Sequence, residues 1–123
     1  MSATVLIAEK NKLFLEALEY ILPSLGFTVV GTTSDRSDCD TLALKTKPEL
    51  LLYDLHLSRD GRAGLTHLKS LKEQLPELKI LVVGFYEATD QLEAEILNAG
   101  FDGFVSKSGN RGEFIKKLND FFP

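Results

Sequence analysis

Five short apolar runs, each followed by a stretch of helical spacing, constrain the fold of this chain more than any other feature. The runs lie at residues 4–8, 27–32, 49–53, 78–83 and 102–105. Most are rich in Val, Ile and Leu without strict polar alternation, which is typical of strands buried on both faces. Apolar residues at helical spacing predict helices over about 11–22, 37–44, 65–75, 89–99 and 112–121.

Residues at the ends of these segments predict where the helices begin and stop. Asn11 is expected to cap the first helix, which Pro23 and Gly26 close. Ser37 is expected to cap the second helix. Asn110 is placed to cap the last helix.

The regular alternation of strand and helix predicts an α/β domain in which helices cover both faces of a parallel sheet. Right-handed crossovers favour a flavodoxin-like (βα)5 three-layer sandwich, with five parallel strands in the order 2-1-3-4-5. In such sheets the functional site lies at the carboxyl ends of the strands, near the switch between the first and third.

Composition excludes several classes of protein. The 123 residues suffice for one domain, 1–123, and 44% hydrophobic with 26% charged residues is a globular balance rather than a disordered one. A net charge of −4 with scattered basic residues argues against direct nucleic-acid binding. Cys39 is the single cysteine, and neither a signal peptide nor a membrane span is evident, so we expect a cytoplasmic location.

Charged residues gather where the first, third and fifth predicted strands end. Asp54 ends the third strand, Glu9 and Lys10 follow the first, and Lys107 follows the fifth. A carboxylate that ends an apolar strand has lost much of its hydration and needs a cation or hydrogen-bond donors nearby. The topology therefore predicts that Glu9, Lys10 and Lys107 approach Asp54. For any one of them, a polar rim without a function is the alternative.

Four segments resemble the receiver domains of bacterial response regulators, in particular those that precede helix-turn-helix DNA-binding domains. They are VLIAEKN at 5–11, GFTVVG at 26–31, PELLLYDLH at 48–56 and AGFDGFVSK at 99–107. The last is the most specific, because a Gly, an Asp-Gly, an aromatic residue and a Lys fall at the spacing of that family. The resemblance covers nearly the whole chain and implies a signalling module, not an enzyme.

The resemblance implies a role for each residue at the strand ends. Asp54 would accept a phosphoryl group from a sensor histidine kinase or a phosphotransfer protein, and Lys107 would pair with a phosphoryl oxygen. Mg²⁺, which prefers oxygen ligands, would be held by Glu9, Asp54 and the backbone carbonyl of His56. Phe104 matches an aromatic residue that turns inward in response to phosphorylation.

The chain departs from the family at several of these positions. The usual acidic pair is here Glu9 and Lys10. The Lys10 ammonium either pairs with Asp54 and repels Mg²⁺, or it points to solvent and leaves a weak metal site. The family's hydroxyl position falls on Gly84 or Phe85, and neither carries a hydroxyl.

Two further departures concern access to Asp54. The ring of Phe85 or Tyr86 is expected to close the approach to the carboxylate. The loop at 58–64 is longer than usual and begins with Ser58 where the family has proline.

Two functions stay open for this fold. The domain is either a phosphoacceptor in a phosphorelay or a pseudo-receiver that binds its partners without phosphorylation. The resemblance predicts a homodimer or effector contact through the face made by the fourth helix, fifth strand and fifth helix. Phe104, Phe121 and Phe122 would be partly exposed apolar residues at or near that face. A solvated charged face is the alternative.

Other functional classes lack their sequence signals. A flavin-binding module needs a Gly/Ser/Thr-rich loop after the first strand, and EKNK at 9–12 is not such a loop. A hydrolase of this class needs a Gly-x-Ser-x-Gly elbow, which is missing. His56 and His67 are too isolated for a metal site or a triad, and we expect His67 on an exposed helix face.

Overall fold

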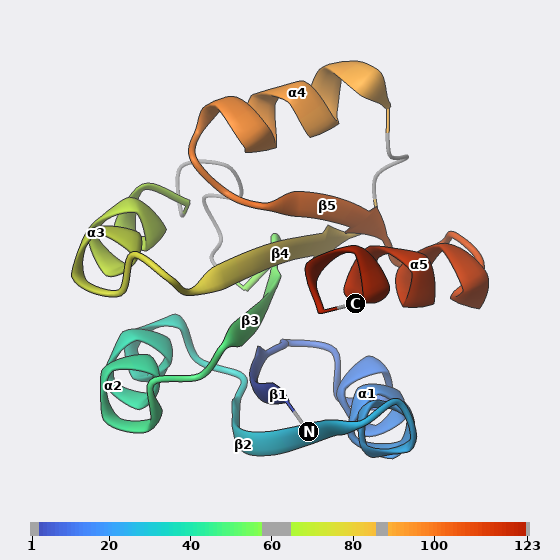
Figure 1. Cartoon of the computed structure of the whole chain (residues 1–123), viewed down its shortest axis with the longest axis horizontal. Coiled ribbons are helices and arrows are strands. Elements are labelled where there is room, and N and C mark those ends of the chain that lie inside the picture. Colours follow the sequence, from blue (N-terminus) through green and yellow to red (C-terminus); the bar gives the residue numbers. More distant parts are fainter. Residues whose placement is uncertain (1–2, 58–64, 86–88, 123) are drawn as a thin grey trace.

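The computed structural model describes residues 3–57, 65–85 and 89–122, and it contains one parallel sheet of five strands in the order β2-β1-β3-β4-β5 (Figure 1). The predicted flavodoxin-like (βα)5 fold is confirmed. The strands are β1 (Ala3–Ala8), β2 (Phe27–Thr33), β3 (Leu50–Asp54), β4 (Lys79–Gly84) and β5 (Gly103–Ser106). The helices are α1 (Lys12–Ser24), α2 (Arg36–Thr46), α3 (Thr66–Gln74), α4 (Asp90–Asn98) and α5 (Arg111–Phe121).

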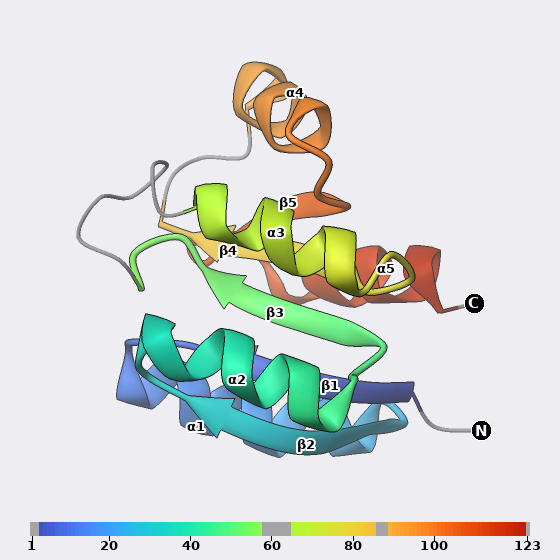
Figure 2. The same cartoon turned by 90° about the vertical axis from the view of Figure 1, so that its left-hand side faces the viewer.

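The helices form two layers, one on each face of the sheet. Helices α1 and α5 cover one face, and α2, α3 and α4 cover the other (Figures 1 and 2). Each face has its own apolar cluster. Leu51 of β3 belongs to the cluster under α2, α3 and α4, whereas Leu50 and Leu52 belong to the cluster under α1 and α5. Successive residues of a strand point to opposite faces, so a strand covered on both sides must be apolar at every position.

The helix ends agree with the sequence at three positions. The side chain of Asn11 accepts a hydrogen bond from the Phe14 amide at 3.0 Å, and that of Asn110 accepts one from the Glu113 amide at 2.9 Å. Both predicted caps are therefore confirmed. Gly26 follows the end of α1 with φ +92°, in the left-handed region that glycine tolerates best.

Two predicted helix ends were wrong. Helix α2 is capped by Asp35 rather than Ser37, because the Asp35 carboxylate accepts hydrogen bonds from both the amide and the hydroxyl of Ser37 at 2.9 Å. Pro23 lies within the last turn of α1 instead of ending it. The chain continues to Ser24 before Gly26 closes the helix.

A polar network crosses the apolar cluster under α2 and α3. The Tyr53 hydroxyl lies 3.0 Å from His67 Nε2, and His67 Nδ1 lies 3.0 Å from Asp40 Oδ1. The predicted exposed position of His67 was wrong, since its side chain is only 13% exposed. A buried tyrosine hydroxyl needs a polar partner. Here His67 of α3 is that partner, and Asp40 of α2 in turn holds the His67 ring.

The structure bears on two expectations drawn from composition, one about the single cysteine and one about membrane spans. Cys39 is a free thiol in the core, and burial raises its pKa to about 12, so it is a poor nucleophile. Among the helices of the described ranges, none is long and apolar enough to cross a membrane.

We predict that Tyr53→Phe lowers the free energy of unfolding by about 1–2 kcal/mol, because His67 Nε2 loses its hydrogen-bond partner while Nδ1 keeps Asp40. Urea unfolding measures this change. Tyr20→Phe is the matched control, because Tyr20 is 84% exposed. This substitution is expected to change the free energy of unfolding by no more than about 0.5 kcal/mol. Equal losses in both variants would show that the network contributes nothing to stability.

Candidate functional site

Three charged side chains meet at the carboxyl edge of the sheet. Asp54 is the last residue of β3, Glu9 follows β1 and Lys107 follows β5. The Lys107 ammonium lies 2.7 Å from Glu9 Oε2 and 3.2 Å from Asp54 Oδ1, and all three side chains are 1% exposed. The strand order places β3 beside both β1 and β4, and β5 beside β4, which brings these three strand ends to one edge.

Backbone amides hold both carboxylates in place. Asp54 Oδ1 accepts a hydrogen bond from the His56 amide at 2.9 Å, and Asp54 Oδ2 accepts one from the Lys10 amide at 3.1 Å. Glu9 Oε2 accepts one from the Asn11 amide at 2.8 Å. Amide donors and an ammonium together offset the cost of removing two carboxylates from water.

The two carboxyl groups differ in acidity. Burial, together with the nearby Asp54 carboxylate, raises the pKa of Glu9 to about 7, against the lowering effect of Lys107. Burial also acts to raise the pKa of Asp54. It is outweighed by Glu9, by the amides of His56 and Lys10 and by the Lys107 charge, which hold that pKa below its usual value. Near neutral pH, Asp54 is therefore the ionised member of the pair and Glu9 the one that carries a proton most readily.

The oxygen atoms at this edge are of the kind that Mg²⁺ binds. Glu9 Oε1 is buried and has no hydrogen-bond partner among the described residues. Two carboxylates and one backbone carbonyl, with water completing the coordination, are an ordinary Mg²⁺ ligand set. Glu9, Asp54 and the carbonyl of His56 therefore fit the metal by donor chemistry. The side chains of the described ranges contain no group of three or more His, Cys, Asp and Glu that would hold an ion without backbone help.

Lys10 is exposed, and it contacts Asp54 through its backbone amide rather than its ammonium. The ammonium that pairs with Asp54 is that of Lys107. Of the two alternatives for Lys10, this geometry favours the one in which its side chain faces solvent. Its positive charge follows Glu9 directly in the chain and is expected to oppose a divalent cation weakly, through solvent.

Two aromatic rings flank the Lys107 ammonium. Its nitrogen lies 4.9 Å from the centre of the Phe85 ring and 5.0 Å from that of Phe14, within the range of cation–π attraction. Phe85 is 58% exposed and its ring also lies beside that of His56. Sequence reasoning missed Phe14, although its position in the first turn of α1, just after the strand end, is a usable signal.

Gly84 and Phe104 pack against each other next to this site. The Gly84 carbonyl accepts a hydrogen bond from the Lys107 amide at 2.6 Å. A Cβ at position 84 would stand 3.4 Å from the Phe104 ring, and Phe104 is 1% exposed. The expectation that Phe104 is partly exposed was wrong, because its ring packs into the apolar cluster under α2, α3 and α4. Tyr86 and the loop at 58–64 lie outside the described residues.

The face of α4, β5 and α5 carries paired charges. Lys117 of α5 forms an ion pair with Glu93 of α4. Phe121 and Phe122 are half-buried against the cluster under α1 and α5. Arg111 lines a pocket on the α1 side of α5. The partner role of the α4-β5-α5 face stays a prediction.

Comparison with known proteins gives consistent matches. The family model described as the response regulator receiver domain matches residues 5–119. A curated relative, the response regulator GacA of Pseudomonas aeruginosa, is 27% identical over 119 residues, covering 96% of this chain and 54% of the relative. The chain spans about half the length of such curated relatives.

Solved structures share the fold. A response regulator from Burkholderia pseudomallei, solved with a phosphorylated aspartic acid, a calcium ion and citrate, is 26% identical with a TM-score of 0.78. The match covers 95% of this chain and 66% of that one. The CheX-CheY complex with beryllofluoride and Mg²⁺ from Borrelia burgdorferi matches with a TM-score of 0.85 at 19% identity, over 98% of this chain and 90% of that one.

We predict that Glu9→Gln becomes more stable relative to the unchanged protein as pH rises. The pKa of Glu9 is about 7 in the folded state and 4.5 for an unperturbed glutamate. The stabilisation that comes from protonated Glu9 is therefore complete below pH 4.5 and lost as pH passes 7. A glutamine never ionises and avoids that loss, which is on the order of 1–3 kcal/mol.

Urea unfolding in chelator, at a series of pH values, measures the difference between the two proteins. Glu16→Gln is the control, because Glu16 is exposed on α1 and its difference is expected to vary little with pH. A Glu9→Gln difference that does not change with pH would contradict the assignment of the proton to Glu9.

Proposed function

Because the chain belongs to the response regulator receiver domain family, we propose that it is the phosphoacceptor module of a two-component phosphorelay. Asp54 receives the phosphoryl group from a sensor histidine kinase or a phosphotransfer protein. One observation carries the proposal. Asp54 is 1% exposed, yet its pKa lies below the usual value despite burial, because Glu9, two backbone amides and the Lys107 charge stabilise its ionised form. An ionised, oriented carboxylate is what a nucleophile for phosphoryl transfer requires.

The proposed step is a displacement at phosphorus. A carboxylate oxygen of Asp54 forms the new O–P bond while the N–P bond of phosphohistidine breaks. The electron pair of that bond stays on the histidine nitrogen, and because the other ring nitrogen is protonated, the histidine leaves as a neutral imidazole. The amides of His56 and Lys10 orient the carboxylate, and the Lys107 ammonium stabilises charge on the phosphoryl oxygens. When bound by Glu9, Asp54 and the His56 carbonyl, Mg²⁺ would supply further neutralisation of that charge.

The output of the module is proposed to be a partner contact rather than turnover of a substrate. A homodimer or an effector binding the α4-β5-α5 face is the proposed form of that contact, in the cytoplasm. Its support is the Glu93–Lys117 pair, which joins α4 to α5 beside the buried ring of Phe104.

A phosphorylation-independent pseudo-receiver is the second candidate, and specific observations favour it. The Lys107 ammonium is already engaged by both Glu9 and Asp54, and Gly84 supplies no hydroxyl for a phosphoryl oxygen. Phe104 is already buried against Gly84 in this structure. In this case the charge cluster is structural, and partners bind to a surface that does not switch.

Beryllofluoride, which mimics a phosphoryl group on aspartate, distinguishes the two candidates. We predict that adding it with Mg²⁺ shifts the amide NMR signals of Asp54, Lys107 and Phe104. The same addition to Asp54→Asn is expected to leave these signals in place. A wild-type spectrum that does not change, or equal changes in both proteins, would contradict phosphoryl transfer and favour the pseudo-receiver.

We further predict that Lys10→Asp strengthens Mg²⁺ binding roughly threefold to tenfold, because it replaces a repulsive charge next to the carboxylates with an attractive one. An NMR titration with Mg²⁺ measures the affinity. Lys12→Asp makes the same charge change at an exposed position two residues further on, and it serves as the control. Equal affinities of the wild type and Lys10→Asp would show that Lys10 does not weaken the metal site.

A further inference from the structure

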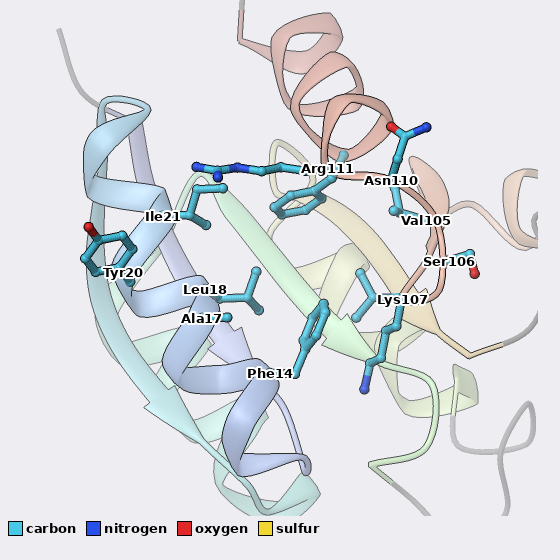
Figure 3. Close-up of a pocket in the computed structure, with 13 residues that line it drawn as sticks. Phe14, Ala17, Leu18, Tyr20, Ile21, Val105, Ser106, Lys107, Asn110 and Arg111 are labelled. Atoms are coloured by element: carbon cyan, nitrogen blue, oxygen red, sulfur yellow. The ribbon is translucent and has the colours of Figure 1, made fainter.

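A pocket of about 350 Å³ lies between α1 and α5, and Lys107 is one of the residues that line it (Figure 3). Its lining comes mainly from apolar side chains. Val83 and Val105 of the sheet line it, with Phe14 and Ile21 from α1 and Phe114 from α5. Of the residues that line it, only Lys107 has a role in the proposed phosphoryl transfer step.

The size and lining of the pocket suit one small apolar group. Small-molecule sites in proteins begin at about 300 Å³ and are mostly apolar with a few placed polar groups. The apolar walls include Phe14, Ile21 and Phe114, and each of these side chains is half-buried. Packing against the neighbouring helices therefore keeps the walls in place when the pocket is empty. A single phenyl ring or a short acyl chain fits within such a volume, since benzene already enters protein cavities of about 150 Å³.

The charged residues of the lining are both cations. Lys107 and Arg111 line the pocket, and no acidic residue of the described ranges does so. This is notable in a chain whose net charge is −4. The Lys107 ammonium is engaged by Glu9 and Asp54, which leaves Arg111 as the cation for an occupant. Figure 3 shows the exposed Arg111 side chain reaching over the pocket toward α1.

We propose that this pocket is a binding site for a small amphipathic anion. The apolar part of the ligand lies between α1 and α5. The carboxylate or phosphate of the ligand pairs with the Arg111 guanidinium at the rim, because the planar guanidinium donates two parallel hydrogen bonds to such anions. Exposed Tyr20 and Asn110 complete the rim. The proposal does not depend on whether Asp54 accepts a phosphoryl group.

The test is an amide NMR titration of the whole chain with hydrocinnamate and, separately, with hexanoate. Saturable shifts centred on Phe14, Ile21, Val105 and Arg111 are expected. The neutral hydrocinnamamide is the matched probe and is expected to bind more weakly. No saturable shift with either carboxylate up to its solubility overturns the proposal. So do shifts at these amides that follow protein concentration without a probe, because they indicate an interface between two copies of the chain.

Two variants at exposed positions separate the apolar and the charged contributions. Ala17→Leu places a larger side chain in the pocket and is expected to abolish binding of every probe. Arg111→Gln is expected to weaken hydrocinnamate about threefold to fivefold, as for an exposed ion pair, and to leave hydrocinnamamide unchanged. Lys116→Gln removes an equal charge from an exposed site of α5 outside the pocket and serves as the control. Hydrocinnamate binding that survives Ala17→Leu, or that falls equally in Arg111→Gln and Lys116→Gln, overturns the proposal.

Discussion

The carboxyl edge of this domain depends on one ammonium buried between two carboxylates. Lys107 lies within 3.2 Å of both Glu9 and Asp54, at a place where none of the three side chains has appreciable contact with water. Removing Lys107 would leave two buried carboxylates without a cation, which costs far more than the cluster contributes as a whole. The ends of β1, β3 and β5 must therefore keep their mutual positions.

The cluster also explains why the two carboxyl groups differ. Asp54 receives backbone amides on both of its oxygens, whereas Glu9 has one oxygen without a hydrogen-bond partner among the described residues. Hydrogen bonds to the charged form lower a pKa and desolvation raises it. Asp54 therefore stays anionic in the core, and Glu9 takes up a proton most readily. The groups that stabilise Asp54 are also those that make it a suitable nucleophile.

Different side-chain contacts surround this edge on the two faces of the sheet. On one face the Tyr53–His67–Asp40 network ties β3 to α2 and α3 directly before Asp54. On the other face Phe14 contacts the Lys107 ammonium and also lines the pocket between α1 and α5. The charged cluster is thus fixed from both sides by side chains of neighbouring helices, which limits its freedom to rearrange.

Local periodicity and topology rules were enough to predict the order of strands and helices, the caps at Asn11 and Asn110, and the position of Asp54 and Lys107 at one sheet edge. They could not predict the shared pairing of Lys107 with Glu9, the burial of Phe104 against Gly84 or the partners of His67. Those contacts became visible in the folded structure. The physical reason is the same in each case. Long side chains have many rotamers, and their choice depends on neighbours distant in sequence that periodicity does not identify.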